Sequence, residues 1–173
     1  MKKTTLLLLG FWWSVAAAAP FGADEEQVLI DKVKVLQNAY EKGDLDSIAT
    51  MTFEPVIAQV GGVDALKKVS QQVIDQAKRM GVVTENLEVG KPTPPLESGE
   101  YLVTFVPKTS TVKMGDKRAK SSSFMIGARR KDQTEWKFMD GAGLRKNPQL
   151  LHSFFPDLPK DVALPPNEVR LIQ

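Results

Sequence analysis

The chain has 173 residues, with 23 lysine and arginine side chains against 21 aspartate and glutamate side chains. This near balance favours neither a nucleic acid nor an acidic membrane surface as a partner. The absence of cysteine excludes disulfides and a thiol nucleophile, and a single histidine, His152, excludes a metal site built from several imidazoles. We therefore expect neither a cofactor nor a metal.

The first residues have the three parts of a secretory signal peptide. Lys2 and Lys3 precede an apolar run over residues 6–15, and small residues follow at 16–19. We predict cleavage after Ala18, which makes residues 1–18 a signal peptide and the mature protein periplasmic or secreted. The apolar run is shorter than the roughly 20 residues that span a bilayer. An uncleaved N-terminal anchor is the alternative.

Two helices are expected next. An apolar stripe at Leu29, Val33, Leu36 and Tyr40 predicts a first helix that ends at Gly43. Asp44 or Asp46 then caps a short second helix, which carries Leu45, Ile48 and Ala49.

A short strand over residues 54–60 is expected to follow, with Pro55 at its start. Gly61 and Gly62 then open a third helix over residues 63–80. The spacing of its apolar residues predicts a buried stripe formed by Leu66, Val69, Val73, Ala77 and Met80.

Beyond Gly81 the periodicity becomes that of strands. Strands are predicted over residues 82–90, 100–108, 109–114, 121–130 and 134–141. Residues 91–99 are rich in turn formers, and Gly115-Asp116 predicts a hairpin turn. Lysine and threonine residues scattered through these strands suit a sheet with one face in water.

This α+β order resembles the NTF2-like (cystatin-like α+β cone) superfamily. The resemblance is carried by "AYEKGDLDSIATM", "VGGVDALKKVSQQVIDQ", "EYLVTFVP" and "SFMIGARRKDQTEWKFMDG". It implies that residues 24–143 form one domain, a curved antiparallel sheet wrapped around a long helix that encloses a pocket open at one end. That superfamily includes isomerases, dehydratases, transport factors and assembly modules, so the resemblance implies no activity.

Asp140 ends a strand whose alternate residues are aromatic. Trp136, Phe138 and Asp140 share one face of that strand. A three-residue turn within residues 131–134 would place Asp140 on the concave side, near Phe124 or Ile126. Three roles stay open: a turn cap before Gly141, a pocket carboxylate that binds a ligand, and a catalytic acid or base.

The candidate ligand-binding residues are the aromatic side chains of the expected concave face together with Asp140. We expect a non-catalytic protein that binds a small apolar ligand or a protein partner through Tyr40, Tyr101, Phe124, Trp136, Phe138 and Asp140. One alternative is an isomerase- or dehydratase-like enzyme that pairs Asp140 with Tyr40 or Tyr101. Another is a homodimer formed through the exposed sheet face, which would carry Lys137 and Arg129.

The last part of the chain, residues 144–173, changes character. Five prolines stand among leucines and phenylalanines, which favours an extended path with one helical turn at 148–154 and a short final strand. We expect this extension to pack on the domain, over a sheet edge or the pocket mouth. A docking arm for another protein, or a lid over a ligand, is the alternative.

Overall fold

The computed structural model describes residues 21–172, so the predicted signal peptide lies outside the described residues. The fold is α+β. Four helices come first: α1 (Ala23–Lys42), α2 (Leu45–Met51), α3 (Glu54–Gln59) and α4 (Val63–Arg79). The antiparallel sheet then contains β1 (Val82–Val89), β2 (Leu96–Ser98), β3 (Tyr101–Met114), β4 (Lys117–Arg130), β5 (Lys137–Asp140) and β6 (Glu168–Ile172). Between β5 and β6 lie the 3₁₀ helix η1 (Gly141–Arg145) and α5 (Gln149–Phe154).

The two N-terminal helices are as predicted. Gly43 ends α1 in the left-handed conformation, at φ 75°, where a side chain would be strained. Asp44 caps α2 by accepting a hydrogen bond from the Ser47 backbone N–H at 3.0 Å. Both helix ends are fixed by local chemistry, which explains why the sequence predicted them.

The strand predicted over residues 54–60 is wrong, because this segment forms α3. Pro55 lies in the first turn of the helix, where its missing N–H is not needed and its fixed φ already suits a helix. The only strand-like pairing described nearby lies before this segment, where Thr52 forms an isolated parallel bridge with Phe138.

Long hairpins form the centre of the sheet. The order is β1-β3-β4-β5, with β2 against β3 and β6 against β4. β3 is one continuous strand where two were predicted, and β2 arises within the segment predicted as turns. The turn at Gly115-Asp116 is confirmed, with Gly115 at φ 59°.

The sheet separates two apolar cores. The face toward α1, α2 and α4 carries Met125, Phe138 and Val106. We call this the helix-side core. The opposite face is covered by the chain after β5 together with Phe53, and its core contains Phe53, Val103, Phe105, Phe124, Ile126, Leu151, Phe155 and Leu158. We call this the C-terminal core.

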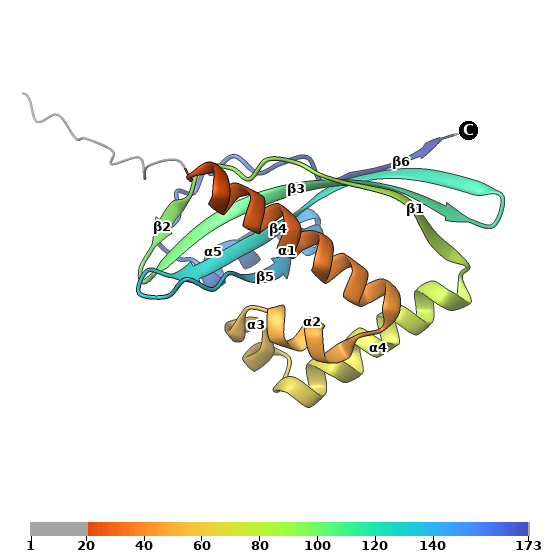
Figure 1. The fold of residues 1–173 in the computed structure, drawn as a ribbon, viewed down its shortest axis with the longest axis horizontal. Coiled ribbons are helices and arrows are strands. Elements are labelled where there is room, and N and C mark those ends of the chain that lie inside the picture. Colours follow the sequence, from red (N-terminus) through yellow and green to blue (C-terminus); the bar gives the residue numbers. More distant parts are fainter. Residues whose placement is uncertain (1–20, 173) are drawn as a thin grey trace, which may run out of the picture.

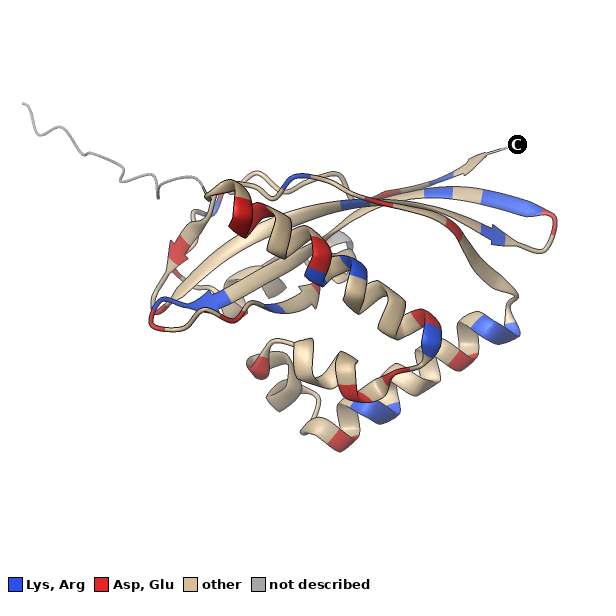
Figure 2. Ribbon diagram, viewed as in Figure 1, with Lys and Arg blue, Asp and Glu red and all other residues tan. Residues whose placement is uncertain are grey.

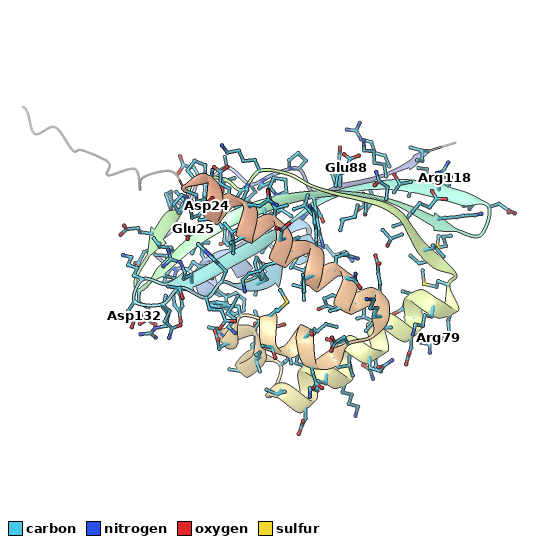
Figure 3. All side chains as sticks on the ribbon, viewed as in Figure 1. Asp24, Glu25, Arg79, Glu88, Arg118 and Asp132 are labelled. Carbon is cyan, nitrogen blue, oxygen red and sulfur yellow. The ribbon has the colours of Figure 1, made fainter. Side chains whose placement is uncertain are left out.

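The prediction of one wet sheet face is therefore wrong for the centre of the sheet. Arg129 and Lys137 were expected on that face, yet their side chains are only 16% and 17% exposed. The lysines and threonines that suggested a wet face belong mainly to the outer half of the β3/β4 hairpin, which extends beyond the helices (Figure 1). Lysine and arginine are frequent near the tip of this hairpin (Figure 2), and Glu88 of the neighbouring β1 and Arg118 of β4 point away from α4 (Figure 3).

The connection between β4 and β5 has a different register from the one predicted. Asp140 pairs with Met125 and Phe138 with Gly127, while Ile126 pairs with Met139. The last pair is Ala128 with Lys137, so eight residues, 129–136, lie between the paired ends, an even number where the prediction required an odd one. Phe138 and Asp140 consequently face the helices, and Phe124 and Ile126 face the C-terminal core.

Candidate functional site

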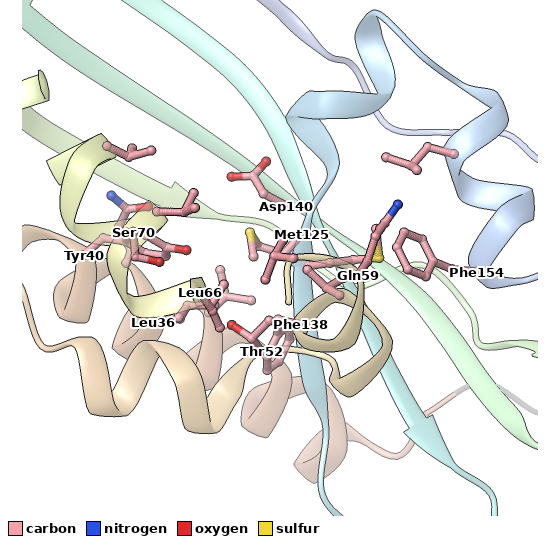
Figure 4. Close-up of a pocket in the computed structure, with 18 of the residues that line it drawn as sticks. Leu36, Tyr40, Thr52, Gln59, Leu66, Ser70, Met125, Phe138, Asp140 and Phe154 are labelled. Carbon is pink, nitrogen blue, oxygen red and sulfur yellow. The ribbon is translucent and has the colours of Figure 1, made fainter. Parts of the chain in front are cut away.

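A cavity of about 560 Å³ lies between the helices and the sheet. The sheet provides Met125 and Phe138 as its wall, and the half-buried Phe154 of α5 stands at one end (Figure 4). The opposite wall is aliphatic and comes from α1, α3 and α4, through Val33, Leu36, Val56, Leu66, Val69 and Val73. Its size falls within the range of about 300–1,000 Å³ that is typical of pockets for small molecules.

One wall of the cavity is an apolar face of α4 that was predicted to be buried and is not. The buried residues are Leu66, Ser70 and Ile74, so Leu66 is the one member of the expected stripe that is buried. Val69 and Val73 stay 47% and 55% exposed, and Met80 is exposed as well. The apolar stripe that the sequence predicted to be buried in α4 is thus in part the open wall of the cavity.

The charged groups that line the cavity are Asp140 and Lys108, which form an ion pair on its sheet wall. Asp140 comes from the end of β5, and Lys108 of β3 reaches it across β4, with 3.3 Å between Nζ and Oδ2. Figure 4 shows the Asp140 carboxylate pointing away from Leu36, Leu66 and Phe138. The cavity is therefore an apolar space with one ion pair on its wall.

The Tyr40 phenol and the Ser70 hydroxyl lie together on the helix side of the cavity (Figure 4). Burial raises the pKa of Tyr40 above its ordinary value, an interaction with the Ser70 hydroxyl partly offsets this, and the Asp140 charge adds a smaller rise. The Tyr40 phenol is consequently a neutral hydrogen-bonding group near neutral pH.

Three of the six candidate residues line this cavity: Tyr40, Phe138 and Asp140. Asp140 also caps η1, because its Oδ1 accepts a hydrogen bond from the Ala142 backbone N–H at 2.7 Å. The turn-cap role and the pocket position were alternatives in the sequence, and the structure combines them.

Tyr101 and Phe124 lie instead on the other face of the sheet. Tyr101 packs edge-on against Phe53, with ring centroids 5.2 Å apart, and Phe124 packs edge-on against Phe105 at 5.7 Å. Phe124 is fully buried in the C-terminal core. A pairing of Asp140 with Tyr101 is therefore ruled out by the register of the sheet.

Trp136 is buried beside α1, outside the cavity. Its indole N–H donates to Glu25 at 3.2 Å, and the Arg129 guanidinium lies 5.1 Å from the ring centroid. Arg129 also pairs with Glu25 at 3.2 Å. This tryptophan joins the start of α1 to the sheet.

No protein-family model, curated protein or solved structure matches this chain. The site therefore has to be interpreted from its own geometry. Within residues 21–172, no group of three or more histidine, cysteine, aspartate or glutamate side chains is placed to hold a metal ion. None of the helices over the same residues is long and apolar enough to cross a membrane.

The sequence missed several cavity residues. Val56 and Gln59 were missed because their segment was assigned to a strand, and Lys108 because it follows a proline near the predicted end of a strand. Val69 and Val73 were recognised as apolar but assigned to the core. An apolar stripe shows which face of a helix avoids water, and it does not show whether another element covers that face.

Proposed function

We propose that this protein binds a small apolar ligand in the cavity between α4 and the sheet, without transforming it. The observation that carries the proposal is the apolar wall of α4: Val69 and Val73 face a cavity of about 560 Å³ and remain largely exposed. Aliphatic side chains that line a cavity and remain exposed to water are not covered by the protein itself. An apolar ligand that covers them removes their surface from water, which favours binding.

Among the described residues that line the cavity, no acid, base and nucleophile converge, which supports binding over catalysis. Both Asp140 oxygens already accept hydrogen bonds within the protein, from Ala142 and from Lys108, and the carboxylate is 55% exposed. A carboxylate that acts as the general base of an isomerase is usually desolvated by burial, and the ion-paired, half-exposed Asp140 is not.

We also propose that the fold is of the NTF2-like kind and that the mature protein is periplasmic or secreted. Support for the first comes from the helices that precede a meander of long antiparallel strands and from a cavity between the two layers. Support for the second comes from the signal-like sequence of residues 1–18. The helix α3 is a departure, since a short strand was expected there.

Replacing Val69 by aspartate is expected to weaken binding of the neutral fluorescent probe N-phenyl-1-naphthylamine by at least roughly tenfold, because a charge then stands in the apolar wall. The matched control is Val28→Asp. Val28 is also on a helix and is 45% exposed against 47% for Val69, and it lies outside the cavity.

Both variants should keep a midpoint of thermal unfolding close to that of the unchanged protein, since substitutions at exposed positions usually change stability by less than about 0.5 kcal/mol. Fluorescence titration measures the binding and circular dichroism the unfolding. Equal loss of probe binding in both variants, or in neither, would contradict the proposed site.

A further inference from the structure

The ion pair on the cavity wall bears on what the ligand is. Lys108 and Asp140 come from β3 and β5, which flank this part of β4 on its two sides, and both side chains lie on the helix-side face of the sheet. Among the described residues that line the cavity, these two are the ones that carry charge. The other polar groups there are amides and hydroxyls, such as those of Gln37, Gln59 and Ser70.

Neither member of the pair has used its full hydrogen-bonding capacity. An ammonium group has three N–H donors, and a carboxylate can accept about four hydrogen bonds. Within the described residues, Lys108 Nζ donates to Asp140, and Asp140 accepts from Lys108 and from the Ala142 backbone. A ligand group beside the pair can therefore accept a hydrogen bond from Lys108 and donate one to Asp140.

The opposite charges of Lys108 and Asp140 together determine which ligand head groups bind favourably. The Lys108 nitrogen and the Asp140 oxygen are 3.3 Å apart. A ligand carboxylate attracted to Lys108 is consequently repelled by Asp140 at almost the same distance, and a ligand ammonium meets the reverse. A hydroxyl or primary amide has both a donor and an acceptor and no net charge, so it interacts favourably with both residues.

We infer that the ligand is an uncharged amphiphile, whose hydroxyl or amide head lies at the Lys108–Asp140 pair and whose hydrocarbon part lies along Val69 and Val73 of α4. This inference rests on the proposed function. The half-exposed Asp140 leaves the head near solvent, and the buried Phe138, two residues before it on the same face of β5, belongs to the apolar part of the wall. The wall thus selects a head group by the balance of two charges.

The test compares ligands that share one hydrocarbon chain and differ in the head. Decanol, decanoate, decylammonium and the zwitterionic decylphosphocholine compete at neutral pH for bound N-phenyl-1-naphthylamine. Decanol is expected to displace the probe from the unchanged protein at roughly tenfold lower concentration than either singly charged ligand.

Two single-charge variants reverse the preference in opposite directions. Lys108→Met keeps the aliphatic stem and leaves Asp140 unpaired, so decylammonium should become the preferred ligand. Asp140→Asn keeps an acceptor for the Ala142 N–H and leaves Lys108 unpaired, so decanoate should become preferred. Lys113→Met removes an exposed lysine of β3 outside the cavity and should change nothing.

The outcomes separate the two proposals. If the neutral probe does not bind the unchanged protein, the proposed function fails and the head-group inference falls with it. If the probe binds but decanoate, decylammonium or decylphosphocholine is preferred over decanol, the head-group inference alone is wrong. Charge variants that leave the order of ligands unchanged would also overturn it.

Discussion

Replacing Phe155 by alanine is expected to lower the free energy of unfolding by about 3–5 kcal/mol, the usual effect of removing a fully buried phenylalanine. Phe155 is 0% exposed in the C-terminal core. Its ring stacks on Phe53 at 5.3 Å and meets Tyr101 at 6.2 Å. Alanine would leave a cavity that these rings cannot fill, because Phe53 is itself fully buried and packed in the same core.

For a protein with a total stability of roughly 5–15 kcal/mol, this is a large share, and the midpoint of thermal unfolding should fall by roughly 10 °C. Phe154→Ala is the matched control, since Phe154 is the preceding residue and is only half-buried. We expect less than half the loss of stability from it, measured by denaturant unfolding.

This pair of variants also distinguishes the two roles considered for the C-terminal extension. A segment that packs on the sheet in solution makes Phe155 far more costly to remove than Phe154. A docking arm that leaves the sheet would make the two substitutions equally mild.

Replacing Gly141 by alanine is expected to lower stability by roughly 3 kcal/mol, at the upper end of the usual effect of overpacking a core. A Cβ at this position would lie 2.4 Å, 2.5 Å and 2.8 Å from three ring atoms of Phe124. That ring is fully buried and is held against Phe105, with centroids 5.7 Å apart. Neither ring can move aside without displacing the core.

Gly143→Ala is the internal control for this effect. Gly143 belongs to the same 3₁₀ helix η1, and a Cβ there would meet no atom within 4 Å. Its replacement should change stability by less than about 0.5 kcal/mol.

A double-mutant cycle identifies the cause. Phe124→Leu in the Gly141→Ala background should cost less than it does alone, because the smaller side chain makes room for the new methyl group. Additive effects of the two substitutions would show that the close approach of Gly141 to Phe124 is not what makes glycine necessary.

Local signals predicted the helices and turns well. Gly43, Asp44 and the Gly115-Asp116 turn act within a few residues of themselves, so their effects can be inferred from the sequence alone. The prediction for the α3 segment was wrong because its local signals are ambiguous. A proline before valine and isoleucine is compatible with both a strand and the first turn of a helix.

The two-sided burial of the sheet was harder to infer, yet it left a trace. Phe124, Met125 and Ile126 are three consecutive apolar residues within one strand, and consecutive apolar residues indicate burial on both faces. The lysines and threonines farther along the same strands masked this signal. The register of β4 and β5 depended on the length of a loop, and a change of one residue moves every side chain to the other face.

That error of register affected the candidate site most. In the actual register Phe124 faces the C-terminal core, whereas Phe138 and Asp140 face the helices. The predicted cluster of aromatic residues is therefore divided between the two faces of the sheet. Lys108 could be assigned to the site only from the three-dimensional structure, because 32 positions separate it from Asp140 in the sequence. Ion pairs of this kind depend on the tertiary fold and not on sequence spacing.

The order of the two cores along the chain has a consequence for biosynthesis. The helix-side core is built from residues that precede η1, whereas Leu151, Phe155 and Leu158 of the C-terminal core follow β1 to β5 in the chain. During synthesis the strands therefore emerge before Leu151, Phe155 and Leu158, which provide part of the cover of this apolar face. Until residue 158 has emerged, the face formed by Val103, Phe105, Phe124 and Ile126 lacks part of its cover, so we expect its packing to be completed late and to be the aggregation-prone step of folding.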